Sequence, residues 1–250
     1  MYFLEQGEGY PIILLHGGTG SSGMWENIIS QLAKHFRVIT PDSRGHGKSD
    51  NPTNNFSYKL MADDIIGLIK ALDLQKPIIC GHSDGGQIAL ELAIHNPNLI
   101  KAIVVSGILI KITEDYIKGL NSWGIEKMGV VNFEKLEDVF KDLLPIIKER
   151  CSAVYGPDYW KTLFIEISKM WLNPEEFPKE KVKDISLPVL IVHGDRDVTP
   201  VEEVLEIHNL IPNSALAIAP NSDHFFVKNN FKLYYNLIID FIQNQLKKNS

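Results

Sequence analysis

Five residues near the middle of the chain combine a nucleophile with the local geometry that would expose it. Residues 81–85 read Gly-His-Ser-Asp-Gly, between an apolar run typical of a strand (77–80) and a helical stretch (87–92). A serine with a glycine two positions away on each side, at a strand-to-helix turn, is typical of a nucleophile elbow. So tight a turn strains the backbone of Ser83, and side chains at its flanks would collide with their neighbours. The first N–H groups of the helix would face an oxygen bound to Ser83, so the segment predicts a nucleophile and a charge stabiliser together.

An ordinary glycine-rich turn with a capping serine would have the same sequence pattern. That structural interpretation makes no prediction for the rest of the chain. The functional interpretation requires an acid and then a histidine downstream. A strand-like run, 187–192, leads into a short acidic loop with Asp195 and Asp197, and Pro200 is suited to begin the next helix. A last strand-like run, 215–219, is soon followed by His224. The order of serine, acid and histidine is therefore present, with two carboxylates competing for the acid's place.

A second glycine-rich loop follows the first long apolar run. Residues 13–20 read Ile-Leu-Leu-His-Gly-Gly-Thr-Gly, and such a loop can present a backbone N–H without obstruction by a side chain. It is a poor phosphate loop, because no Gly-Lys-Ser/Thr follows and its spacing does not match a dinucleotide-binding fingerprint.

Length and composition favour no macromolecular partner. The 250 residues suit one large domain, or a domain with an inserted subdomain, and the formal net charge is -6. Acidic and basic residues are interleaved, so no basic stripe for nucleic acid and no membrane patch is expected. The N-terminus has no leader pattern and no run reaches the length of a membrane span, which leads us to expect a soluble cytoplasmic protein. Cys80 and Cys151 offer neither a disulfide framework nor a metal spacing.

Strand-like and helix-like stretches alternate along most of the chain. This alternation predicts an α/β fold with a doubly wound, mostly parallel sheet. The predicted strands are Ile12 to His16, Val38 to Thr40, Ile78 to Cys80, Ile103 to Ser106, Val189 to His193 and Leu216 to Ala219. The predicted helices are Met24 to Lys34, Tyr58 to Leu72, Gly85 to Asn96, Val201 to Leu210 and Lys232 to Leu246.

The alternation fails between about residues 107 and 183, where three helical segments are expected. We interpret residues 107–183 as a helical cap inserted into a core formed by residues 1–106 and 184–250. Trp123, Trp160 and Trp171 all fall in this segment. Helical spacing usually indicates packing, so most of its aromatic residues are expected to build its own small core, while some line a pocket.

Taken together, these motifs resemble those of the α/β-hydrolase fold family, over essentially the full length of the chain. The residues that carry the resemblance are His16-Gly17-Gly18, Asp42 to Ser49, Gly81 to Gly86, His193 to Asp197 with Pro200, and His224. The resemblance implies Ser83 as nucleophile, His224 as general base, and Asp197 rather than Asp195 as the acid that orients the histidine.

The implied chemistry begins when His224 takes the proton of Ser83 as the serine attacks a carbonyl carbon. Backbone N–H groups of Gly18 and Asp84 would bind the oxyanion, each contributing about 3 kcal/mol to the transition state. Water activated by His224 would then hydrolyse the acyl-serine. No cofactor is required, and no residue cluster suggests a metal site.

Supporting or packing roles are expected for the other seven histidines. His16 and His82 adjoin the site, His46 belongs to a turn that is structural in the family, and His193 ends a strand. His35, His95 and His208 lie on predicted helices.

Two features depart from the family pattern. The chain begins close to the strand that precedes Ile12, so the first strand of many relatives is expected to be missing or truncated, leaving a sheet of about seven strands. Asp84 directly follows the nucleophile, where many relatives have an apolar residue. Its carboxylate suits a helix N-terminus but would oppose an oxyanion, so we expect it to point away from the pocket.

The sequence favours a serine hydrolase, most simply a carboxylesterase, that cleaves small, mostly apolar esters, thioesters or lactones. The alternatives on the same scaffold are hydrolysis of a carbon–carbon bond in a diketone and removal of an N-terminal residue from a peptide. Carbon–carbon hydrolases of the family tend to carry a longer loop of the Gly-Gly-Gly-Pro type, where this chain has Gly17-Gly18-Thr19. Epoxide hydrolases and haloalkane dehalogenases are disfavoured, because their nucleophile is a carboxylate at the place of Ser83. A small-ligand receptor without turnover is a further alternative; the oligomeric state is open.

Overall fold

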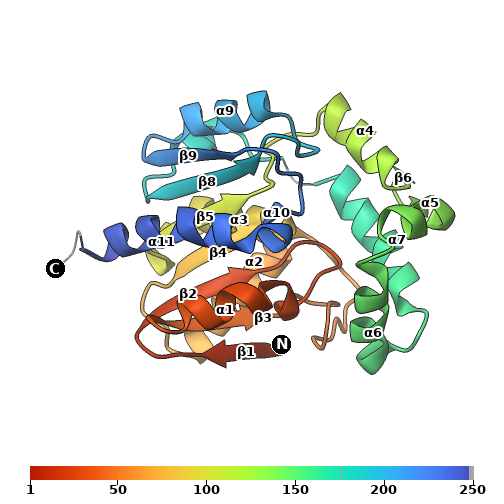
Figure 1. Cartoon of the computed structure of the whole chain (residues 1–250), viewed down its shortest axis with the longest axis horizontal. Helices are drawn as coiled ribbons and strands as arrows, with labels where there is room; N and C mark the ends of the chain where they lie inside the picture. The colour runs from red at the N-terminus through yellow and green to blue at the C-terminus, as the bar shows by residue number, and fades with distance from the viewer. Residues whose placement is uncertain (175, 248–250) are drawn as a thin grey trace.

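The chain forms a seven-stranded sheet with helices on both faces (Figure 1). The computed structural model describes residues 1–174 and 176–247. The order across the sheet is β1-β3-β2-β4-β5-β8-β9, and all neighbours are parallel except β1, which runs antiparallel to β3. The strands are β1 (Phe3–Gln6), β2 (Tyr10–Leu15), β3 (Phe36–Pro41), β4 (Ile78–His82), β5 (Ala102–Ser106), β8 (Val189–Gly194) and β9 (Ser214–Ala219).

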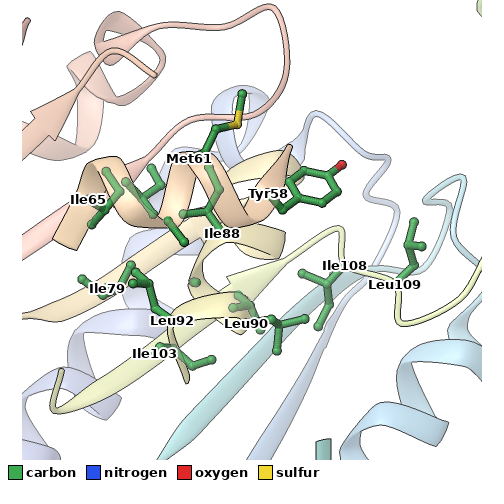
Figure 2. Packing of buried hydrophobic residues seen from close by; sticks show 14 of the residues in the cluster. Tyr58, Met61, Ile65, Ile79, Ile88, Leu90, Leu92, Ile103, Ile108 and Leu109 are labelled. Carbon is green, nitrogen blue, oxygen red and sulfur yellow. The ribbon is translucent and has the colours of Figure 1, made fainter. Parts of the chain in front are cut away.

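Alternating side chains of the central strands explain the two helical layers. Ile13, Ile79 and Ile103 face one core, which contains α2 (Tyr58–Ala71), α3 (Asp84–His95) and α9 (Val201–Leu210). Their neighbours Ile12, Ile78 and Val104 face the opposite core, with α1 (Glu26–Leu32) and α11 (Phe231–Lys247). Figure 2 shows the first of these cores, where side chains of α2 and α3 pack over Ile79 and Ile103. Strands buried on both faces read as continuous apolar runs, which is why these strands could be predicted.

The predicted strands are all present, each with ends within two residues of the expected position. The N-terminal edge of the sheet is the short β1, so the sheet has seven strands, as expected. The predicted helix over residues 24–34 begins instead as a 3-10 turn, η1 (Ser22–Trp25), which leads into α1. A second 3-10 turn, η2 (Pro97–Leu99), precedes β5, and α10 (Phe226–Asn229) precedes α11.

The 107–183 segment contains more elements than the three helices expected. They are α4 (Glu114–Ser122), β6 (Ile125–Lys127), β7 (Val130–Val131), α5 (Phe133–Val139), α6 (Leu144–Tyr155), α7 (Tyr159–Leu172) and α8 (Lys179–Lys183). The strands β6 and β7 form a small antiparallel hairpin, with Gly129 at a φ of 72° in its turn. Pro145 lies in the first turn of α6. The apolar residues that recur at helical spacing over 133–147 are therefore divided between two helices, α5 and α6. Figure 1 shows α4 to α7 gathered at one end of the sheet.

Candidate active site

The turn between β4 and α3 has the strained geometry that its glycines predict. Ser83 adopts a φ of 53° and a ψ of -119°, which is unusual for a residue with a side chain. A Cβ at Gly81 would lie 2.1 Å from the Gly85 carbonyl oxygen, and a Cβ at Gly85 would lie 2.2 Å from that of Leu15. Both positions therefore require glycine, and the turn holds Ser83 at the end of β4.

Ser83, His224 and Asp197 form one chain of hydrogen bonds. The Nε2 of His224 lies 3.0 Å from the hydroxyl oxygen of Ser83, and its Nδ1 lies 2.9 Å from the Oδ1 of Asp197. Because a carboxylate can only accept, Nδ1 carries the proton of the neutral ring and Nε2 is free to accept from Ser83. Ser83 follows β4, Asp197 follows β8 and His224 follows β9. The three lie together because the carboxyl ends of parallel strands share one edge of the sheet.

The electrostatics of the pair suit a base that must become charged. Burial acts to lower the pKa of His224, but the charge and hydrogen bond of Asp197 outweigh it and raise that pKa above its usual value. Burial acts to raise the pKa of Asp197, but His224 outweighs it and holds this pKa at about 2. Asp197 is therefore ionised at neutral pH and stabilises the imidazolium form of His224.

Asp195, the competing carboxylate, lies apart from His224. It is exposed, and its Oδ1 accepts from the backbone N–H of Ser222 at 2.9 Å. Hydrogen bonds from Ser222 and Asn221 lower its pKa. Asp195 therefore braces the loop before His224, whereas Asp197 contacts the ring itself.

Four of the remaining histidines are buried near the site, and burial keeps them uncharged. Burial lowers the pKa of His46 to about 3 and that of His82 to about 3, and it also lowers those of His16 and His193. The ring of His82 lies 4.8 Å from that of His224, and its Nδ1 lies 3.0 Å from the Ser106 hydroxyl. The neutral ring of His82 thus packs against His224 without competing for its proton, whereas His16 and His46 pack against each other at 5.2 Å.

The loop after β2 lies directly against Ser83. A Cβ at Gly17 would lie 3.1 Å from the Cβ of Ser83. Among the hydrogen bonds of the described residues, none has the backbone N–H of Gly18 or Asp84 as its donor. Neither N–H group is therefore engaged by an acceptor of the described residues. Thr19 adopts a φ of 58°, a conformation that glycine favours, so the loop follows a glycine-type path although its third residue is threonine.

Asp84 turns its carboxyl group away from the larger cavity but remains buried beside Ser83. Its Oδ1 accepts from the Tyr58 hydroxyl at 3.0 Å and from the Trp171 indole N–H at 2.8 Å. Its Oδ2 is buried and makes no hydrogen bond with the described residues. Burial raises the pKa of Asp84 to about 6, although both donors act to lower it. The expectation that Asp84 points away from the pocket is therefore wrong for the smaller cavity, which Asp84 lines together with Ser83 and His224.

Two cavities meet at Ser83 and His224. The larger, of about 190 Å³, is walled mainly by aromatic and aliphatic side chains and has Arg150, Lys228 and Glu26 in its lining. The smaller, of about 20 Å³, has room for one small group and is lined by apolar and polar side chains, Asp84 among the polar ones. Trp123 and Trp171 line both cavities, and the Trp123 ring lies 5.4 Å from that of His224. Trp160 instead packs against Phe133 and Phe164, as expected for the core of the 107–183 segment.

Sequence reasoning missed Tyr58 and Arg150. Tyr58 reads as an apolar position of α2, and nothing in the pattern of α6 sets Arg150 apart from other surface cations. Arg150 donates to the Ser21 hydroxyl and has no carboxylate partner among residues 1–174 and 176–247. Over the same residues, no group of three or more His, Cys, Asp or Glu side chains is placed to hold a metal ion. No helix among them is long and apolar enough to cross a membrane.

Known proteins resemble this chain over most of its length. A family model described as alpha/beta hydrolase fold matches residues 10–128. The AB hydrolase superfamily protein YisY of Bacillus subtilis is 32% identical over 239 residues, which cover 89% of this chain and 88% of that protein. The 2-hydroxy-6-oxo-6-(2'-aminophenyl)hexa-2,4-dienoic acid hydrolase of Metapseudomonas resinovorans is 29% identical over 253 residues, covering 96% and 86% of the two chains.

A solved structure has the same fold. A mutant of the meta-cleavage product hydrolase CumD from Pseudomonas fluorescens IP01 superimposes with a TM-score of 0.77 at 28% identity. The match covers 97% of this chain and 93% of that one.

Proposed function

Because the chain belongs to the alpha/beta hydrolase family, we propose that this hydrolase cleaves the carbon–carbon bond of a 2-hydroxy-6-oxo-2,4-dienoic acid. The observation that carries the proposal is the Ser83, His224 and Asp197 chain of hydrogen bonds at a largely apolar cavity that also contains a guanidinium group. Relatives of nearly the same length are named for such acids, including 2-hydroxy-6-oxo-2,4-heptadienoate hydrolase of Pseudomonas putida, 27% identical over 252 residues. These relatives support carbon–carbon cleavage, whereas the sequence motifs alone favour ester hydrolysis.

The substrate's chemistry defines which bond breaks. A 2-hydroxy-6-oxo-2,4-dienoic acid contains no ester or amide, so hydrolysis must divide its carbon skeleton. In its keto tautomer, carbon 2 carries a carbonyl group conjugated to a double bond between carbons 3 and 4. An electron pair released at carbon 5 can then delocalise onto the carbonyl oxygen at carbon 2. The bond between carbons 5 and 6 is therefore the one that can break.

The residues at the site can carry out this cleavage in two steps. Ser83 bonds to carbon 6 as its proton passes to His224, and the oxyanion accepts from the N–H groups of Gly18 and Asp84. When the tetrahedral adduct of the keto tautomer collapses, the bond between carbons 5 and 6 breaks and its electron pair delocalises onto the oxygen at carbon 2. The proton held by His224 passes to that oxygen, which gives the 2-hydroxydienoic acid. Water then attacks the acyl-serine, giving up a proton to His224, which returns it to the Ser83 oxygen. One water molecule is consumed, and a carboxylic acid and a 2-hydroxydienoic acid are released.

The lining of the larger cavity suits an acid with an apolar body. Arg150 presents a planar guanidinium group that can bind a carboxylate through two hydrogen bonds. Aromatic and aliphatic side chains around it suit the hydrocarbon part of the substrate. In this proposal the 107–183 segment is a cap over the core of residues 1–106 and 184–250, and it contributes Trp123, Trp171 and Arg150 to the cavity.

The short glycine loop, which by itself disfavours carbon–carbon cleavage, does not exclude it. Thr19 occupies the left-handed conformation that a third glycine would favour, so the backbone follows a path available to the longer loops. Ester hydrolysis uses the same residues with an alcohol as leaving group, and remains the second candidate.

The test compares purified enzyme on 2-hydroxy-6-oxo-2,4-heptadienoate and on p-nitrophenyl butyrate, with products identified by mass spectrometry. We expect acetate and 2-hydroxy-2,4-pentadienoate, with a higher kcat/KM for the dienoate than for the ester. Ser83→Ala should reduce both activities by roughly 10⁴-fold or more. Arg150→Gln should raise KM for the dienoate more than for the uncharged ester. Turnover of the ester without cleavage of the dienoate would contradict the proposal in favour of an esterase.

A further inference from the structure

The smaller cavity beside Ser83 differs in chemistry from the larger one. Its lining includes the polar side chains of Tyr58, Asp84, Gln87, Tyr116 and Thr199. Of these two cavities, the larger is lined by Arg150, Lys228 and Glu26, whereas no lysine or arginine of the described residues lines the smaller one. Cations therefore outnumber carboxylates in the lining of the larger cavity, whereas Asp84 is the one carboxylate among the described residues that line the smaller.

Asp84 is the source of the negative charge in the smaller cavity. Its Oδ1 is occupied by the Tyr58 hydroxyl and the Trp171 indole, whereas its Oδ2 is buried without a hydrogen bond to the described residues. An unsatisfied buried acceptor costs about 1–3 kcal/mol, and more when it is charged. The nearby Tyr116 hydroxyl is buried as well, and its pKa is raised first by burial and then by the charge of Asp84. Asp84 thus has, beside this cavity, one buried carboxylate oxygen that no donor of the described residues satisfies.

We propose that the smaller cavity is a subsite for a hydrogen-bond donor, a hydroxyl or a protonated amine, on the shorter arm of the substrate, with Asp84 as the acceptor. The proposal rests on the proposed function in so far as Ser83 must bond to the substrate. A carboxylate at the opposite end of the molecule would be repelled by Asp84 and attracted by Arg150, which fixes the direction in which the substrate binds.

The position of Asp84 gives this subsite an effect on catalysis as well as on binding. A Cβ at Gly18 would lie 2.6 Å from the Oδ2 of Asp84, so the carboxylate lies against the loop that would bind the oxyanion. A negative charge here opposes the charge that develops on the substrate oxygen. A donor bonded to Asp84 offsets that repulsion. Substrates with a donor should therefore show a higher kcat as well as a lower KM.

Boronic acids, which form reversible adducts with an active serine, test the subsite directly. The ligands are phenylboronic acids with a methyl, hydroxyl or aminomethyl group at the meta position, and Kd is read from tryptophan fluorescence because Trp123 and Trp171 line both cavities. The hydroxyl or the aminomethyl compound should bind about tenfold more tightly than the methyl compound, the size of one satisfied hydrogen bond. A preference for hydroxyl identifies a neutral donor, and one for aminomethyl identifies a cation.

The informative variant is Asp84→Asn. Its side-chain oxygen can still accept from Tyr58 and Trp171, while its NH₂ group places a donor where Oδ2 was, so the tenfold advantage should disappear. Asp195→Asn, which removes an exposed carboxylate from the loop before His224, should keep the advantage. The wild-type protein provides a second test without mutation: lowering the pH below about 6, the pKa of Asp84, should reduce the advantage of the aminomethyl compound.

The outcomes separate the two proposals. Equal affinity of the wild-type protein for all three boronic acids would overturn the subsite while leaving the nucleophile intact. Failure of every boronic acid to bind, or binding that persists in Ser83→Ala, would contradict the role of Ser83 and with it both proposals. An advantage that survives Asp84→Asn would show that another group is the acceptor.

Discussion

The indole N–H of Trp171 donates to the carboxylate of Asp84 at 2.8 Å, joining helix α7 to the residue that directly follows Ser83. The Tyr58 hydroxyl of α2 donates to the same oxygen. Three segments far apart in the sequence thus meet at one buried carboxylate. The contact fixes the indole ring over Gly18, where a Cβ would lie 2.5 Å from it.

The two carboxylates of the loop after β8 should differ sharply in importance. Asp197→Asn replaces the acceptor that holds Nδ1–H of His224, and an asparagine can favour the wrong tautomer, so kcat should fall by about 10⁴-fold with the fold intact. Asp195→Asn, a matched change two residues away, should alter kcat only slightly, because Asp195 bonds to backbone rather than to His224. Steady-state kinetics with circular dichroism of both variants provide the check. A larger loss in Asp195→Asn would reverse the assignment.

The dependence of kcat/KM on pH should report His224. The general base must be neutral, so kcat/KM should fall as pH decreases through the pKa of His224, which Asp197 raises above its usual 6.5. Removing that carboxylate in Asp197→Asn should move the residual acid limb to lower pH. An acid limb at the same pH in both proteins would show that another group controls it.

Gly18→Ala should impair catalysis more than stability. Its methyl group would collide with the Trp171 ring and the Asp84 carboxylate, at 2.5 and 2.6 Å, and would displace the backbone N–H from the oxyanion position. Loss of one such donor costs about 10²- to 10³-fold in kcat. Gly67→Ala is the control: it lies in helix α2 with open space around it and should stabilise the protein by up to about 1 kcal/mol at unchanged kcat. A normal kcat for Gly18→Ala would exclude its N–H from the oxyanion hole.

Asp84→Asn should stabilise the protein at neutral pH but not in acid. Burial raises the pKa of Asp84 in the folded protein to about 6, above its usual 3.8, so the folded protein favours the protonated carboxyl group. The stability this provides is fully present below about pH 4 and is lost as pH rises through about 6. From pH 4 to pH 7.5, the wild type should lose up to about 3 kcal/mol of unfolding free energy relative to Asp84→Asn. Urea titrations at both pH values measure the difference, and parallel curves would mean that Asp84 titrates normally.

The sheet and the order of the site residues could be predicted because both depend on local patterns. Continuous apolar runs mark β4 and β8, and Gly81 and Gly85 are required by a close approach of backbone atoms that any side chain would prevent. Loops after neighbouring parallel strands meet at one edge, so Ser83, Asp197 and His224 could be expected to lie together. That expectation is met by the hydrogen bonds between them.

Features that depend on contacts between distant segments could not be predicted. Tyr58 reads as an apolar helix position, and its bond to Asp84 depends on how α2 packs against α3. Residues 133–147 carry one apolar stripe, and only the turn before Pro145 divides it into two helices. Asp84 itself satisfies the rule for a helix N-terminus, which conceals that one of its oxygens is left without a donor.

The bond between Trp171 and Asp84 limits how the protein can be re-engineered by exchanging segments. Chimeras that take residues 107–183 from a relative would retain Ser83, Asp197 and His224, because these follow strands of the sheet. A relative without tryptophan at the position of Trp171 would leave the buried carboxylate of Asp84 with one donor fewer. Positions 84 and 171 therefore need to be exchanged together. Chimeras that take both residues from the same relative should fold and bind substrate, whereas chimeras that exchange residues 107–183 without position 84 should not.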